Sequence, residues 1–246
     1  MTSFEVWLPL GAIGLYLFDS ILWLYSNELI FQHRGGKWIC AGIPALLVAG
    51  RRVYFPNPLN PGTPQFKVRW SESDRRMEQE GAAELDEFFH ALLPIEYLVN
   101  TLLVILLILP VELLLFGTGT ELLVLMAAFY LVIVVALVCI FERRRQLRLT
   151  GRAFAALCFD SLACSPFAVN LVRKLSLRRS LAGNPIAFAA RSFESAQFSR
   201  LIDAVTARVA EDLLREDGRT ARAEELEAYR KQLEAMVAVQ PPPDRH

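Results

Sequence analysis

Apolar residues are concentrated in three long blocks, at residues 6–26, 95–116 and 121–141, and polar residues fill the stretches between them. A helix of about 20 apolar residues crosses the roughly 30 Å of hydrocarbon in a bilayer. Trp7 and Trp23 lie near opposite ends of the first block, as is typical of side chains at membrane interfaces. The pattern therefore predicts a mainly α membrane protein with three transmembrane helices.

The second and third blocks form one predicted transmembrane hairpin over residues 95–141, because only a short Gly-Thr-rich stretch separates them. The 26 Lys and Arg residues all lie in two stretches, Arg34–Arg76 and Arg143–Arg245. Basic segments next to spans stay on the cytoplasmic side. We therefore expect an inner membrane of bacterial type, with the N-terminus outside and the C-terminus in the cytoplasm.

The first basic stretch belongs to a predicted cytoplasmic insert at residues 33–94, which combines short β-strands, a proline-rich loop and an amphipathic helix over residues 74–93. Four prolines between positions 56 and 64 exclude helix and stiffen the loop. A stiff loop loses little entropy on binding, so it is a candidate docking element, although a plain connection between strands explains it equally well. The candidate docking residues in the loop are Pro58, Leu59 and Pro61.

The region after the third span is predicted to be cytoplasmic throughout. Residues 142–182 are basic near the membrane. Within them, residues 153–172 are long enough to cross the bilayer a fourth time, but we favour an interfacial or re-entrant helix, because the basic residues on both flanks can then lie at the same anionic surface. Pro166 argues against one continuous helix there. Apolar residues at helical spacing predict an αα-hairpin over residues 183–240, followed by a loose tail at 241–246. The apolar rows of the two helices either bury each other or dock on a partner protein or on a second copy of the chain. The candidate contacts are Phe198, Ile202, Val205, Leu226 and Leu233.

Polar side chains within the spans are the strongest site candidates, because they are costly in lipid and face protein or water. At 1.5 Å per residue, Asp19, Asn100 and Tyr130 lie at similar depth. They predict either a hydrogen-bonded clasp between spans, which we favour, or a proton or ion relay.

A second, weaker group lies on the interfacial segment and consists of Asp160, Asn170 and Arg173. Basic residues there suit lipid phosphate groups. The four cysteines and three histidines lack metal-ligand spacing, and no nucleotide-binding or hydrolase motif occurs. No cofactor, metal or catalytic residue is predicted, and the net charge of zero gives no reason to expect nucleic acid.

These features favour a non-enzymatic membrane protein that acts through protein contacts of its cytoplasmic regions, either as an accessory subunit of a membrane complex or as an immunity-type protein. Besides the lipid bilayer, its expected partner is another protein or a second copy of the chain. One alternative is a small oligomeric channel or transporter that uses Asp19. Another is a lipid-acting enzyme in which Asp160 and its neighbours contact head groups.

Overall fold

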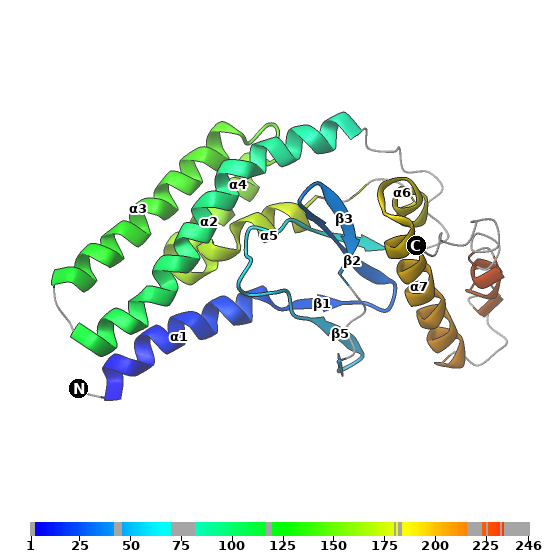
Figure 1. Cartoon of the computed structure of the whole chain (residues 1–246), viewed down its shortest axis with the longest axis horizontal. Coiled ribbons are helices and arrows are strands. Elements are labelled where there is room, and N and C mark those ends of the chain that lie inside the picture. Colours follow the sequence, from blue (N-terminus) through cyan, green and yellow to red (C-terminus); the bar gives the residue numbers. More distant parts are fainter. Residues whose placement is uncertain are drawn as a thin grey trace, which may run out of the picture. The chain divides into compact units, whose positions relative to one another are not determined.

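The computed structural model shows a mainly helical protein with a small region of β-sheet (Figure 1). The structure describes residues 3–41, 46–69, 82–116, 120–179, 181, 184–215, 223–224, 226–231 and 233. The chain divides into two compact units. Unit 1 comprises Met1–Leu22, Phe55–Pro64 and Gly81–Arg178. Unit 2 comprises Trp23–Tyr54, Gln65–Glu80 and Arg179–His246.

Unit 1 is built around three long helices, α1 (Ser3–Ser20), α2 (Ala82–Phe116) and α3 (Thr120–Glu142). Helix α2 packs against both α1 and α3 (Figure 1). It continues through Pro94, so the described part of the predicted amphipathic helix and the second apolar block form one helix. Residues 74–81 of that amphipathic helix, and residues 117–119 of the predicted tight connection, lie outside the described part of the chain.

Among the residues that the structure describes, two helices are long and apolar enough to cross a membrane, Glu84–Leu113 within α2 and Thr120–Glu142. In the most apolar part of Thr120–Glu142, only 28% of the residues are buried inside the protein, whereas most residues of a core helix are buried. The buried residues of α3 recur at helical spacing, as a stripe that packs on the protein, and are Phe129, Ile133, Ala136, Leu137 and Ile140. Large apolar side chains such as Leu123 and Leu131 are more than 60% exposed on its remaining surface.

The first apolar block differs from its predicted course. Helix α1 ends at Ser20, and Leu22–Leu24 form strand β1 instead of a last helical turn. The cause is tertiary, because β1 pairs with β5 (Arg51–Tyr54) in a three-stranded sheet. Helix α1 is about 27 Å long at 1.5 Å per residue and is not among the two helices that qualify as spans by composition.

The segment after α3 folds as a broken hairpin. Helix α4 (Gly151–Ala163) begins at Thr150, whose side chain accepts the N–H of Ala153, and ends at Cys164. A 3-10 helix, η1 (Ser165–Asn170), and helix α5 (Leu171–Leu177) follow. The predicted interruption at Pro166 is therefore confirmed, and α4 alone, about 20 Å long, is shorter than a membrane span.

Unit 2 contains two three-stranded sheets of short strands, and they confirm part of the predicted β insert. One sheet has the order β1-β5-β4, with β4 at Leu47–Val48. The other has the order β3-β2-β6, with β2 at Glu28–Arg34, β3 at Lys37–Cys40 and β6 at Gln65–Arg69. Residue Phe31 lies opposite Cys40 on one side and Phe66 on the other. Strands β1 and β2 start earlier than the predicted insert.

Helices α6 (Pro185–Ser192) and α7 (Ser195–Arg215) pack on β3 and close the core of unit 2. Helix α6 begins at Asn184, whose side chain accepts the N–H groups of Ile186 and Ala187. The core is rich in aromatic contacts, which join Phe31, Trp38, Phe66, Phe188 and Phe193.

The apolar row predicted on the C-terminal helices is present, but the chain itself covers it. Phe198, Ile202 and Val205 are each 3% exposed or less. In the next helical stretch Leu233 is buried as well, while Leu226 is half-buried. These side chains therefore serve the core of unit 2 and do not offer a surface to a partner. The predicted tail at 241–246 lies outside the described residues.

Candidate functional site

A buried polar cluster lies at the C-terminal end of α1 in unit 1. It joins three segments that are far apart in sequence, namely the last turn of α1, the proline-rich loop at 55–64 and the η1–α5 junction. The members are Tyr16, Asp19, Ser20, Asn57, Pro58, Asn60, Asn170, Arg173 and Lys174. We call this set the α1–α5 clasp.

Arg173 is the centre of the clasp and is 2% exposed. Its Nη1 donates to Ser20 Oγ at 3.1 Å and to Asn170 Oδ1 at 3.0 Å. Its Nη2 donates to the carbonyl oxygens of Asn57 at 2.5 Å and Asn60 at 3.2 Å. The planar guanidinium carries five donors in a fixed fork, so one side chain can hold four acceptors from three segments.

Asp19 neutralises part of the cationic charge in the clasp. Its Oδ2 lies 3.1 Å from Lys174 Nζ and accepts a hydrogen bond from Asn170 Nδ2 at 3.0 Å. The Lys174 ammonium also lies 4.6 Å from the centre of the Phe167 ring. A buried charge is tolerated when it is paired and hydrogen-bonded, and Asp19 meets both conditions.

The clasp fixes the conformation of the proline-rich loop. Besides the two carbonyls held by Arg173, the carbonyl of Pro58 accepts a hydrogen bond from the Tyr16 hydroxyl. Within the loop, the N–H of Leu59 donates to Asn57 Oδ1 at 3.0 Å. The side chain of Leu59 is left 71% exposed at the tip, while Pro61 is buried and Pro58 half-buried.

The residues predicted to meet within the spans are distributed over three places. Asp19 belongs to the clasp, as described above. The side chain of Asn100 lies on α2 against Gly62, where an added Cβ would approach its amide nitrogen to 3.2 Å. Tyr130 lines an apolar cavity of unit 1. A polar clasp at the end of α1 therefore exists, but its partners come from η1 and α5.

The second predicted group is brought together in part. Asn170 and Arg173 are bonded to each other, three residues apart across the η1–α5 junction. Asp160 lies in α4, half-buried, and in the described part of the chain it does not join them. Because Pro166 breaks the helix between these residues, the spacing of a single continuous helix gives no guide to their contacts.

The chain matches no protein family, no curated protein and no solved structure. Conclusions about its function therefore rest on the arrangement of its own residues.

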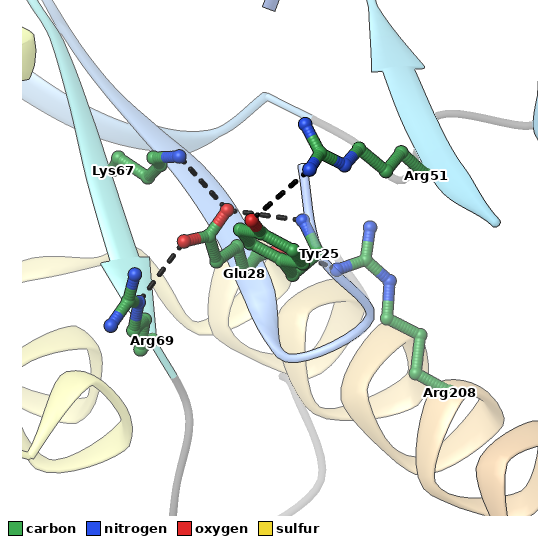
Figure 2. A network of polar contacts seen from close by, with 6 residues as sticks. All are labelled: Tyr25, Glu28, Arg51, Lys67, Arg69 and Arg208. Atoms are coloured by element: carbon green, nitrogen blue, oxygen red, sulfur yellow. Dashed lines mark hydrogen bonds and ion pairs between the residues drawn. The ribbon is translucent and has the colours of Figure 1, made fainter. Parts of the chain in front are cut away.

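A second polar cluster lies in unit 2, around the carboxylate of Glu28 (Figure 2). The side chain of Glu28 is fully buried, and its two oxygens lie 2.9 Å from Lys67 Nζ and 3.0 Å from Arg69 Nε. Oε2 also accepts the backbone N–H of Tyr25 at 3.0 Å. Burial raises the pKa of Glu28, but these three hydrogen bonds outweigh it and hold the pKa below its ordinary value.

Sequence reasoning missed the role of Glu28, although a signal was present. Lys67 and Arg69 are two residues apart in a strand, so their side chains point to the same face. Two cations on one face of a short strand indicate an acidic partner on the neighbouring strand. The register confirms this, since Glu28 lies opposite Arg69 on β2.

The unit 2 cluster is completed by Arg208 of α7, which is 2% exposed and donates to the backbone carbonyl of Glu28 (Figure 2). Burial, and then the nearby charge of Arg52, lower the pKa of Arg208 to about 10, so it stays cationic near neutral pH. Arg52 itself pairs with Glu211 on α7. These ionic contacts attach α7 to the strands, which is a structural use of charge.

Proposed function

We propose that this chain is a non-enzymatic integral membrane protein of the bacterial inner membrane. In this proposal α1, α2 and α3 all cross the bilayer, with the N-terminus outside and the basic stretches in the cytoplasm. The length and apolar surface of α2 and α3 support it, as does the packing of α1 along α2. The distribution of Lys and Arg sets the direction.

The broken hairpin of α4, η1 and α5 is proposed to be re-entrant. Its tip, Ala163–Pro166, lines a cavity together with Leu106, near the middle of the proposed span at 95–116, and Phe129, near the middle of α3. Non-helical backbone is tolerated at membrane depth where protein surrounds it. In this chain η1 packs against α1, α2 and α4, which provides that cover.

The protein is proposed to act through contact with another protein, and the loop that carries Leu59 is the proposed docking element. The observation that supports this is the fixing of three loop carbonyls, at Asn57, Pro58 and Asn60, by buried side chains. An exposed Leu59 on a fixed loop binds with little further ordering of the chain. The ion pair of Asp19 with Lys174 favours a structural role for Asp19 over a relay.

Photocrosslinking in intact cells tests the docking proposal. A photoreactive amino acid replaces Leu59 in the full-length chain, and the products are separated by size. We expect a discrete adduct of protein size. The same adduct should weaken at least severalfold when Arg173→Lys is added, because an ammonium cannot hold four acceptors in a fork and the loop loses its fixed shape.

The matched control places the same photoreactive group at Leu214 of α7, which is 88% exposed and belongs to unit 2. It reports collisions with abundant proteins and should give no discrete adduct. Crosslinks from position 59 to lipid alone would contradict docking on a protein. An adduct that is insensitive to Arg173→Lys would contradict the role of the clasp.

A further inference from the structure

Unit 1 contains an apolar cavity of about 510 Å³. Helix α1 lines one side with Trp7, Ala12 and Leu15, and α3 lines the other with Met126, Phe129 and Tyr130. Between them Leu106, Leu109 and Leu113 of α2 form the floor. The lining is therefore almost entirely hydrocarbon and aromatic.

The two ends of the cavity differ. One end is closed by the tip of the broken hairpin, where Cys164, Ser165 and Pro166 contribute. The other end is bordered by Trp7, Leu113 and Leu122, which lie near the start of α1, the end of α2 and the start of α3. Trp7 is 69% exposed, so this end is open at the edge of unit 1.

We infer that this cavity is a binding site for one acyl chain of a phospholipid. Its volume lies within the roughly 300–1,000 Å³ of cavities that enclose small ligands. Three turns of a helix about 10–12 Å wide would fill on the order of 1,300–1,800 Å³, which excludes a transmembrane helix as the occupant. An empty cavity of this kind would cost the lining its dispersion contacts, and the surrounding bilayer supplies acyl chains.

Charge at the open end indicates the class of phospholipid. Glu112 precedes Leu113, and Glu121 precedes Leu122, so two acidic residues lie at the same level of α2 and α3 as this end, although neither lines the cavity itself. All 26 Lys and Arg of the chain lie within residues 34–76 and 143–245, so none lies before residue 34 or within residues 77–142. An anionic head group would be repelled here, whereas the ammonium of a zwitterionic head group is attracted. The site is therefore assigned to a zwitterionic phospholipid.

This inference rests on the membrane placement in the proposed function but not on the docking role of Leu59. Native mass spectrometry of the full chain, released from detergent after washing, tests it. The wild type should keep one phospholipid, identified by its mass, and phosphatidylethanolamine should be retained over phosphatidylglycerol when both are offered in equal amounts.

The cavity-filling variant is Ala12→Trp, and the matched control is Ala127→Trp on an exposed, non-lining position of α3. We expect at least a tenfold loss of the bound lipid for Ala12→Trp and none for the control. If Ala12→Trp does not fold, Ala12→Leu replaces it, with a smaller loss expected.

Equal lipid retention by both tryptophan variants, or no retained lipid on the wild type, would overturn the site. Retention of phosphatidylglycerol instead of phosphatidylethanolamine would overturn the head-group assignment. Loss of the photocrosslinked adduct at position 59 would contradict the docking role but would not change lipid retention. The docking proposal and the lipid site can therefore be refuted independently.

Discussion

Replacing Arg173 by methionine should loosen unit 1 more than any other single change to the clasp. Methionine keeps much of the apolar stem but has no donor, so Ser20 Oγ, Asn170 Oδ1 and the carbonyls of Asn57 and Asn60 each lose a hydrogen bond. Asp19 keeps its partner Lys174. The change therefore isolates the part of the clasp that holds the proline-rich loop.

The magnitude follows from the acceptors that are left. A buried acceptor left without its donor costs about 1–3 kcal/mol, and hydrogen bonds from a charged donor are stronger than those between neutral groups. Ser20 and Asn170 can still bond to each other, so the two carbonyls account for most of the cost. We expect the free energy of unfolding to fall by roughly 3–5 kcal/mol. For a chain of this size, that lowers Tm by about 6–20 °C.

Thermal unfolding in detergent, followed by circular dichroism, measures the shift. The matched control is Arg178→Met, at the end of α5, because Arg178 is exposed and its Nη1 makes one hydrogen bond to the carbonyl of Ala153. Exposed contacts of this kind contribute less than about 1 kcal/mol. If Arg173→Met lowers Tm no further than Arg178→Met does, the reasoning about the clasp is refuted.

Three further predictions concern other parts of the chain. Because the folded state lowers the pKa of Glu28 from its ordinary value of 4.5, its carboxylate stabilises the fold above that pH, and the contribution is lost as the pH falls. Glu28→Gln should therefore unfold at a midpoint that varies less between pH 3 and 7 than that of the wild type, and an equally steep profile would contradict this. Val205→Ala, in the core of unit 2, should lower the free energy of unfolding by about 1–3 kcal/mol in denaturant titrations, while the exposed Val138→Ala should change it by less than about 0.5 kcal/mol. Asp19→Asn should destabilise unit 1 by about 1–3 kcal/mol but give the same flux as the wild type in proteoliposomes, so a flux that is lost only in the variant would revive the relay.

The long helices were the most predictable part of the fold. The apolar length of α3 is a local property, so the block at 121–141 predicts Thr120–Glu142 within a residue at each end. The end of α2 was predicted as well, but its start was not, because the amphipathic helix before residue 95 continues into the span without a break. The end of α1 was predicted too late, because Leu22–Leu24 adopt strand geometry only through pairing with β5, about 30 residues further along the chain. Periodicity likewise found the buried row of α7, but it could not show that β3 covers that row.

The sequence predicted a polar clasp that includes Asp19, but not the other residues that form it. Depth along the spans placed Asp19 beside Asn100 and Tyr130, since depth is what a hydropathy pattern provides. The actual partners, Asn170 and Lys174, come from a broken hairpin whose turn at Cys164–Pro166 cannot be positioned by counting residues. Of the three candidate docking residues in the loop, Leu59 is exposed, whereas Pro61 is buried and Pro58 half-buried, a difference that the spacing of the prolines does not provide.

Because the chain is synthesised from its N-terminus, the clasp can form only late in synthesis. Asn170 leaves the ribosome 151 residues after Asp19. At about 5–20 residues per second, the first helix waits roughly 8–30 s before the groups that compensate its carboxylate exist. During that interval water or another protein must solvate the acid. The finished arrangement of α1 and its loop can therefore form only after the hairpin has been delivered to it.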